Sequence, residues 1–449
     1  MSSPLTAPYP ARNTVFRSFG KIVHVALIGA LLLSSSVSAT EAPLTLAQAR
    51  HLAIDRSRQL VAQDYAVAAS RDMAVAAKQL PDPILKLGID NLPVNREDRY
   101  SVTRDFMTMR RVGLAQEFTR ADKRILRANR FDREAEKSLA EKDVTTATIE
   151  RDATFAWLDR YYAEAMAAVI VEQVSQARIE MQAAEGAYRA GRGNQADIFV
   201  ARSAFATFDD RASEFQRRVR NATTMLARWI GAAAEMPLVG HPVTDTIRLD
   251  PATLDTKLAH HPQIAVLRKQ EEIAQADAQL AQANKKSDWS VEVAYQQRGP
   301  AYSNMISVGV SIPLQWDRKN RQDRELSSKL ALVEQAKAER EEMLHAHVAE
   351  TRTMINEWEN DRERSARYQH ELIPLAQQRT AATITSYRGG KASLAEVLTA
   401  RRNEIDVRIH ALQLESETAR IWAQLNFLFP ESNASAHPNS TLNRSDNEQ

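Results

Sequence analysis

Residues 188–202 read YRAGRGNQADIFVAR, and residues 387–401 read YRGGKASLAEVLTAR, so one short pattern occurs twice in this chain of 449 residues. Each copy has the form Tyr-x-x-Gly, followed by an acidic residue and an apolar residue. Glycine between two long helical patterns is typical of a point where the chain reverses. Internal repeats must be considered before any fold is assigned, and this one predicts two copies of one structural unit.

The repeat extends well beyond these two turns. A helical pattern at 44–60 is matched at 254–270, and an alanine-rich helical segment at 66–78 is matched at 271–284. Two alternating segments, a long helical run, the turn and a second long run follow in each half. We predict this division of the chain: a signal peptide at 1–39, a first structural repeat at 40–231, a linker at 232–245, a second repeat at 246–430 and a disordered polar tail at 431–449.

The N-terminal segment has the pattern of a secretory signal. Three basic residues, Arg12, Arg17 and Lys21, precede the apolar run 25–33, and small residues then lead to a predicted cleavage site after Ala39. The chain has no cysteine, so it forms no disulfide and carries no thiol for a lipid anchor. Its 59 Lys and Arg nearly balance its 57 Asp and Glu, which argues against nucleic acid as a partner. We expect an exported, non-lipidated protein.

The long helical runs are the largest feature of the sequence. From about Ala121 to Gly186 there is no proline and no internal glycine, and at about 1.5 Å per residue such a run reaches about 100 Å as a helix. Apolar residues recur every three or four positions along it: Phe155, Leu158, Tyr162, Met166, Ile170 and Val174. Long helices that fold back at a turn form antiparallel coiled-coil hairpins, whose apolar seams pack on one another. The corresponding run of the second half is interrupted only by Pro374.

Strict alternation of apolar and polar residues at 289–296 and 306–314 predicts strands with one dry face and one wet face. The first half repeats this less regularly at 83–90 and 112–118. The strands are about long enough to cross a bilayer. The predicted lipid-facing side chains are Leu85, Leu87, Val112, Leu114, Trp289, Val291, Val293, Tyr295, Ile306, Val308, Val310 and Ile312.

Four strands in one chain cannot close a barrel by themselves. An open sheet edge in lipid leaves backbone groups unpaired, each at a cost of several kcal/mol. Three chains would supply twelve strands, an even number within the range of outer-membrane barrels. The alternative is a soluble sandwich whose apolar face is covered by a helix. The predicted fold class is therefore mainly α with β: long antiparallel coiled-coil hairpins plus four strands per chain.

Taken together, these features resemble the TolC family of trimeric outer-membrane efflux ducts. The resemblance covers about residues 44–430, and it is carried by the paired turns, by the strands VGLAQEF (112–118) and VGVSIPL (308–314), and by LPDP (80–83). It implies a homotrimer with a helical α-barrel and a twelve-stranded β-barrel, placed in the outer membrane and extending into the periplasm. It also implies a periplasmic adaptor protein and an inner-membrane RND pump as partners, and outer-membrane lipid as surroundings.

The segments LGIDNLP (87–93) and VGLAQEFTRADKR (112–124) are similar to the heavy-metal branch of this family, the cobalt–zinc–cadmium and copper–silver ducts. This resemblance implies metal cations as cargo, with drugs or other small organic compounds as the alternative. The residues themselves predict no metal site and no cofactor. His345 and His347 are two apart on a helix and point away from each other, and His260 and His261 precede Pro262 in a helix-entry segment. We interpret all four as solvated.

In the family, the two turns form the periplasmic end of the duct. The residues predicted to contact the adaptor there are Tyr188, Arg189, Gly191, Arg192, Tyr387, Arg388, Gly390 and Lys391. Gly191 and Gly390 are expected where a Cβ would clash as the chain reverses. Asp197 and Glu396 have two interpretations: each stabilises the first turn of its helix through the helix dipole, or both belong to an acidic gate held shut by the nearby cations.

Two other classes of function are alternatives to a duct. A periplasmic coiled-coil adaptor or scaffold normally has one helical hairpin between small β domains, whereas this sequence predicts two hairpins, each preceded by amphipathic strands. An enzyme is not expected, because no nucleophile elbow, phosphate-binding loop or metal-ligand spacing is found. We therefore predict a passive duct with no catalytic residues.

Overall fold

The computed structural model describes residues 43–431. The predicted signal peptide with its cleavage site at Ala39, and all of the predicted tail except Glu431, lie outside this range. The elements are α1 (Leu46–Arg56), α2 (Arg58–Ala77), β1 (Ile84–Asp90), β2 (Met109–Phe118), α3 (Ala121–Arg189), α4 (Gln195–Ile230), η1 (Gly231–Glu235), η2 (Pro251–Thr253), α5 (Leu254–Leu258), α6 (Pro262–Ala283), β3 (Trp289–Gln297), β4 (Met305–Ser311), α7 (Gln322–Arg367), η3 (Tyr368–Leu372), α8 (Ile373–Arg388) and α9 (Leu394–Asn426). Two helices, two strands and a helical hairpin follow one another in each half, while the duplication itself and the predicted boundaries stay predictions.

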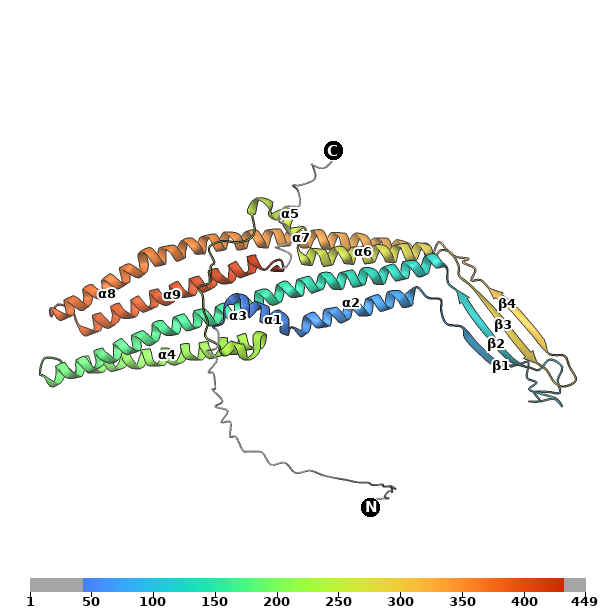
Figure 1. The fold of residues 1–449 in the computed structure, drawn as a ribbon, viewed down its shortest axis with the longest axis horizontal. Coiled ribbons are helices and arrows are strands. Elements are labelled where there is room, and N and C mark those ends of the chain that lie inside the picture. The colour runs from blue at the N-terminus through green and yellow to red at the C-terminus, as the bar shows by residue number, and fades with distance from the viewer. Residues whose placement is uncertain (1–42, 432–449) are drawn as a thin grey trace, which may run out of the picture. The chain divides into compact units, whose positions relative to one another are not determined.

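The long helix predicted from Ala121 is confirmed. Helix α3 has 69 residues, so it is about 100 Å long. It continues through Gly186 and ends at Arg189, because a glycine weakens a helix without removing a hydrogen bond. One end of α3 follows strand β2, and the other end leads into the first helical turn (Figure 1).

The helices pack in two different sets along α3. Next to the strands, α3 lies against α2 and α6, and α6 lies against α7. Toward the turns, α3 lies against α4 and α9, and α9 also packs on α7 and α8 (Figure 1). The predicted apolar stripe faces these partners, with Leu158, Tyr162 and Ile170 all buried. The expectation of a packed seam between long helices is confirmed.

The second hairpin is less regular than the first. Helix α7 passes into the π-helix η3 immediately before α8, and Pro374 stands in the first turn of α8. Proline has no N–H to donate to the preceding turn, and the wider π-turn is a common way to absorb such an interruption. Helix α8 also buries only Thr380. The second hairpin therefore has weaker internal packing than the first.

The four strands form one antiparallel sheet in the order β1-β2-β3-β4. The two halves of the chain meet through the β2–β3 pair, in which Phe118 lies opposite Trp289 and Leu114 opposite Val293. Strands β1 and β4 each have one edge without a partner strand among residues 43–431. Within the same residues, no helix is both long enough and apolar enough to cross a membrane.

Candidate functional site

One face of the sheet carries large apolar side chains. Residues that lie opposite each other in antiparallel strands point to the same face. The register aligns two such rows across all four strands, Leu85–Leu114–Val293–Val308 and Leu87–Val112–Tyr295–Ile306. Their exposure reaches 73% for Ile306 and 69% for Val308. The sequence-based prediction that these residues share one face is confirmed, and no helix of residues 43–431 packs over that face.

The predicted extent of β4 needs a correction. The strand was expected at 306–314, but it occupies Met305–Ser311, so Ile312 lies one residue beyond it. The reason is Pro313, which has no N–H for the ladder and restricts the residue before it. Strands β1 and β4 have seven residues each, against ten in β2 and nine in β3. The edge strands are thus shorter than the predicted crossing length.

The opposite face of the sheet is polar and charged. The Lys86 ammonium lies 2.5 Å from the Glu292 carboxylate, although a whole strand separates their backbones. Arg111 lies between the carboxylates of Asp90 at 3.4 Å and Glu292 at 3.6 Å. Gly113 is the residue opposite Lys86, and a Cβ there would come within 3.1 Å of the Ala294 side chain. The glycine therefore leaves room for charges from three strands to meet.

A buried ion pair joins the two halves where the sheet meets the helices. Lys123, at the start of α3, donates to Asp288 just before β3 at 2.7 Å, and only 5% of the Lys123 side chain is exposed. Asp288 also accepts from the Arg120 backbone N–H at 2.9 Å. A carboxylate with two donors is well compensated for its burial. This pair fixes the sheet relative to α3 and α6.

The two helical tips have the same backbone. Gly191 and Gly390 both have φ of +72°, a conformation that glycine adopts far more readily than other residues. In each tip the glycine N–H bonds to the tyrosine carbonyl three residues earlier, from Tyr188 or from Tyr387. The predicted reversal at these glycines is confirmed, but the predicted reason is wrong. A Cβ at either position would meet nothing within 4 Å, so the constraint is the backbone angle and not a clash.

Asp197 and Glu396 occupy equivalent positions in two capping boxes. The Asn194 side chain accepts from the Asp197 N–H, and the Asp197 carboxylate accepts from the Asn194 N–H. In the second tip, Glu396 accepts from the Ser393 N–H at 2.6 Å, and the Ser393 hydroxyl accepts from the Glu396 N–H. These bonds from Ser393 lower the pKa of Glu396. Both acidic residues therefore stabilise the start of their return helices, as the first of the two interpretations expects.

The basic residues of the tips are largely free of partners within the chain. Arg189 reaches Glu185 on its own helix at 3.6 Å, and Arg202 of α4 bonds the same carboxylate at 2.7 Å. In the part of the chain that the structure describes, Arg192, Arg388 and Lys391 form no ion pair. The exposed side chains of Tyr188 and Tyr387 lie in the same turns. The tips thus present cationic and aromatic groups on a hydrogen-bonded turn.

No family model matches the chain. Over 385 residues, 84% of this chain and 87% of the relative, it is 23% identical to the cobalt-zinc-cadmium resistance protein CzcC of Cupriavidus metallidurans. Its structure is similar to the outer-membrane channel OprN, with a TM-score of 0.69, 17% identity and coverage of 86% of this chain and 90% of that one. It is also similar to CusC, with a TM-score of 0.71, 16% identity and coverage of 85% and 91%. The chain has the fold of an outer-membrane channel.

This outer-membrane channel fold confirms, at the level of the fold, the resemblance seen in the sequence. In this fold the two hairpins meet along a seam between α3 and α9. Three ion pairs join α3 to α9 along that seam: Arg401–Glu180, Arg408–Glu172 and Arg420–Asp159. Ion pairs on partly exposed helix faces contribute little energy each, but their spacing along the helices fixes the register of one hairpin against the other.

The structure shows that the interpretation of His261 as a solvated histidine is wrong. His261 is only 7% exposed, and its ring lies 4.6 Å from the ring of His347. Its Nδ1 accepts from the Gln263 N–H at 3.2 Å, so it caps helix α6. Burial lowers the pKa of His261 to about 4, and the adjacent His347 acts in the same direction. Solvation was the wrong interpretation because the segment before Pro262 packs against α7 and Phe429, which a local pattern does not reveal.

Two features of the structure were not predicted from the sequence. One is the His261–His347 contact, and the other is a pocket of about 670 Å³ between α3, α9, the end of α7 and the segment 241–245. Neither has a motif, because each joins residues that are distant in the chain. Within residues 43–431, no group of three or more His, Cys, Asp or Glu side chains is arranged to hold a metal ion.

Proposed function

We propose that this chain is the outer-membrane duct of a tripartite efflux system. The observation that carries the proposal is the sheet: an exposed apolar face, a charged opposite face and two free edges, placed at one end of α3. A sheet of this kind is unstable alone in lipid and in water. It becomes stable when β4 of one chain pairs with β1 of the next. Three chains then close a twelve-stranded barrel in a homotrimer.

In this arrangement the apolar rows contact outer-membrane lipid, and the charged face with Lys86, Arg111 and Glu292 lines the water-filled interior. The helices extend from the barrel into the periplasm. Four helices per chain surround the passage at each level: α2, α3, α6 and α7 near the sheet, then α3, α4, α8 and α9 near the tips. The duct is passive, and an inner-membrane RND pump supplies the energy.

The tips are the proposed docking point for the periplasmic adaptor. Their cationic and aromatic side chains, Arg192, Tyr188, Arg388 and Tyr387 among them, are exposed on turns that the chain itself makes rigid. Asp197 and Glu396 then serve two purposes: they cap the return helices, and in the trimer they form the acidic part of a gate. Adaptor docking would replace the contacts that keep this gate closed.

Heavy-metal cations are the proposed cargo. The similarity to CzcC, whose name is that of a cobalt-zinc-cadmium resistance protein, supports this choice. A duct passes cations without holding them, so a charged lining with no ligand cluster fits the task. Small organic compounds, such as drugs, are the alternative cargo, and the fold itself does not discriminate between them.

The test is growth of a deletion strain of the host bacterium, with its parent as reference, across cobalt, zinc, cadmium, nickel, copper and silver and a panel of drugs. The strain is complemented with the wild-type gene or with one encoding Val308→Arg, which places a charge on the apolar face. Increased sensitivity to the cations alone, restored only by the wild type, is the expected result. Sensitivity to drugs alone would replace the cargo and keep the duct. Restoration by both genes would contradict the membrane barrel and favour a soluble adaptor or scaffold.

A further inference from the structure

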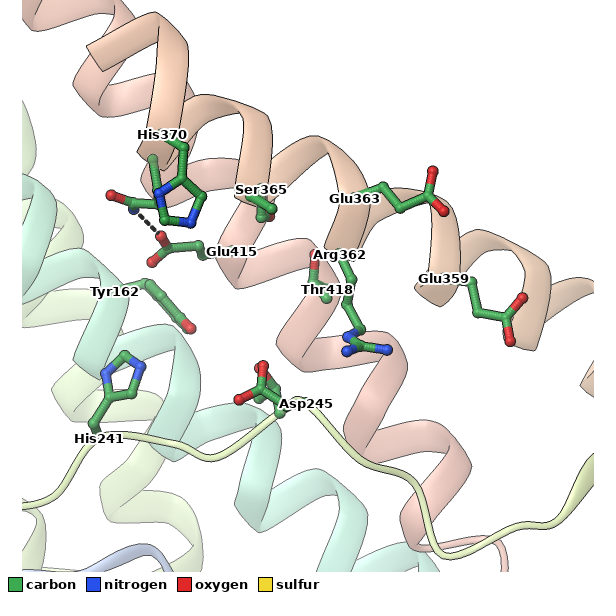
Figure 2. Close-up of a pocket in the computed structure, with 13 residues that line it drawn as sticks. Tyr162, His241, Asp245, Glu359, Arg362, Glu363, Ser365, His370, Glu415 and Thr418 are labelled. Atoms are coloured by element: carbon green, nitrogen blue, oxygen red, sulfur yellow. Dashed lines mark hydrogen bonds between the residues drawn. The ribbon is translucent and has the colours of Figure 1, made fainter. Parts of the chain in front are cut away.

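A pocket of about 670 Å³ lies away from both the sheet and the tips. Its walls come from α3, from α9, from the segment 241–245 and from the stretch where α7 passes into the π-helix η3 (Figure 2). The π-helix contributes Gln369 and His370 to the wall. A π-turn inserts one residue into a helix and so changes the direction of the side chains that follow, and such turns often occur at functional sites.

Tyr162 of α3 points its hydroxyl into this pocket (Figure 2). The residue is only 3% exposed, and its ring packs edge-on against Tyr161 at 5.1 Å. Among residues 43–431 the hydroxyl has no hydrogen-bond partner. Burial raises the pKa of Tyr162, so the phenol keeps its proton. The hydroxyl oxygen is not among the fully buried polar atoms that lack a partner, so it lies open to the pocket and can bond water or a ligand there.

The pocket wall is strongly acidic. Asp245, Glu359, Glu363 and Glu415 contribute carboxylates from three different elements, and within the described chain none of them forms an ion pair. Glu415 accepts only a neutral donor, the Gln369 amide, at 2.5 Å. The arginine of the wall, Arg362, stacks over the Trp358 ring at 4.6 Å. The carboxylates thus outnumber the cations that the chain supplies to them.

The form of the site decides which kind of cation it suits. Metal ions need several ligands within about 2.0–2.6 Å of one point, and no described group of three or more acidic or histidine side chains has that arrangement. The carboxylates instead line a space of a size typical for small organic ligands. Glu359 and Glu363 lie one helical turn apart on α7, and their side chains extend away from Glu415 of α9 toward the outer rim of the pocket (Figure 2). This spacing suits a flexible molecule with positive charges at several positions.

We propose that this pocket binds an organic polyammonium ion, with ammonium groups paired to the carboxylates and Tyr162 hydrogen-bonded to an amine. The neutral phenol completes a hydrogen bond that the chain leaves unmade. The ring of Tyr162 and the stem of Arg362 contact the methylene segments between the charges. This binding is separate from export through the duct, so either property can fail while the other holds.

The test uses the full chain in detergent and isothermal titration calorimetry with spermidine at fixed ionic strength. Wild-type protein is expected to bind spermidine saturably, with one site per chain. Tyr162→Phe keeps the packing and is expected to weaken binding about 5- to 10-fold, the effect of one hydrogen bond. Glu363→Gln combined with Glu415→Gln is expected to abolish saturable binding. Propylamine, with a single charge, should bind far more weakly than spermidine.

The matched control is Glu417→Gln, which removes the same charge from an exposed position of α9 outside the pocket wall. It is expected to bind spermidine as the wild type does. Equal affinity in the control and the pocket variants would overturn the proposal, and so would the absence of any saturable heat. Displacement of spermidine by an equal concentration of Mg²⁺ would also overturn it, because it would reduce the site to a nonspecific acidic surface. Far-UV circular dichroism of each variant checks that the fold is retained.

Discussion

The two ends of helix α3 differ in whether a single chain pairs its backbone groups and covers its apolar side chains. At the sheet end, two strand edges are free and apolar side chains such as Ile306 are 73% exposed. At the tips, the turn carbonyls, the glycine N–H groups and both capping boxes are bonded within the hairpin. The sheet therefore leaves backbone edges and apolar side chains without partners in the described chain, whereas the backbone of each tip is hydrogen-bonded within its own hairpin.

The largest expected effect tests the dependence of the sheet on lipid. Val308→Arg places a charge on the apolar face, at a cost of about 3 kcal/mol per chain near the middle of a bilayer. We expect loss of the assembled trimer from the outer-membrane fraction. Ser307→Arg, one residue earlier and on the opposite face, is the matched control and should still assemble. Equal amounts of both variants in the membrane would contradict the assignment of the two faces.

The second prediction concerns the region between the two ends. The pKa of His261 is about 4 in the folded chain and about 6.5 when unfolded, so the unfolded chain binds more protons between these values. The contribution of His261 to the free energy of unfolding is therefore full above about pH 6.5, and it falls as the pH drops toward 4, by up to about 3 kcal/mol. His347, Arg151 and Glu350 line the same small cavity.

The measurement is the apparent melting temperature of the purified protein from pH 7.5 to 4. His261→Asn keeps a capping side chain at the start of α6 but removes the titrating group, and it is expected to flatten this pH profile. His260→Asn changes the exposed neighbour and should leave the profile steep. A profile that is equally steep in both variants would assign the acid sensitivity to other groups.

The sequence predicted the elements well because each has a strong local signal. The absence of proline and glycine predicts α3, and the alternation around Val291 and Val308 predicts the strands and their shared face. Local patterns also placed Gly191 and Gly390 correctly in the turns. In each of these cases the deciding forces act over a few residues.

The features that the sequence did not predict have a different physical origin. The burial of His261 depends on His347 of α7 and on Phe429, both more than eighty positions away along the chain, and no local pattern encodes such packing. The Tyr162 pocket likewise joins α3 to residues of the second half. The charges of the sheet meet because Gly113 leaves space between strands, which only the register reveals. All three features thus depend on tertiary contacts between segments that are distant in the chain.

A smaller loss of stability is expected at the tips, where the backbone groups are bonded within one hairpin. Gly191→Ala and Gly390→Ala force an alanine into the left-handed region, at a cost of about 1–2 kcal/mol each. Because both glycines have φ of +72° and open space at Cβ, the two losses of apparent melting temperature should be similar. Gly389→Ala, whose φ is −83°, serves as the control and should cost less. A large difference between Gly191 and Gly390 would mean that something other than backbone strain distinguishes the tips.

The smallest effect on stability, and the sharpest on function, is expected for the two acidic residues of the tips. Asp197→Asn and Glu396→Gln retain an oxygen that accepts the capping hydrogen bond, so each return helix should still begin where it does. They remove two negative charges per chain, and in a closed trimeric gate this weakens the pairing with Arg192 and Lys391. We therefore expect a higher ion conductance of the double variant in planar bilayers, with an almost unchanged melting temperature. The capping role alone predicts the opposite pattern, because alanine at both positions would then lower the melting temperature and leave the conductance as it was. Comparing the amide and alanine variants separates the two roles, since only the gate responds to charge when the cap is kept.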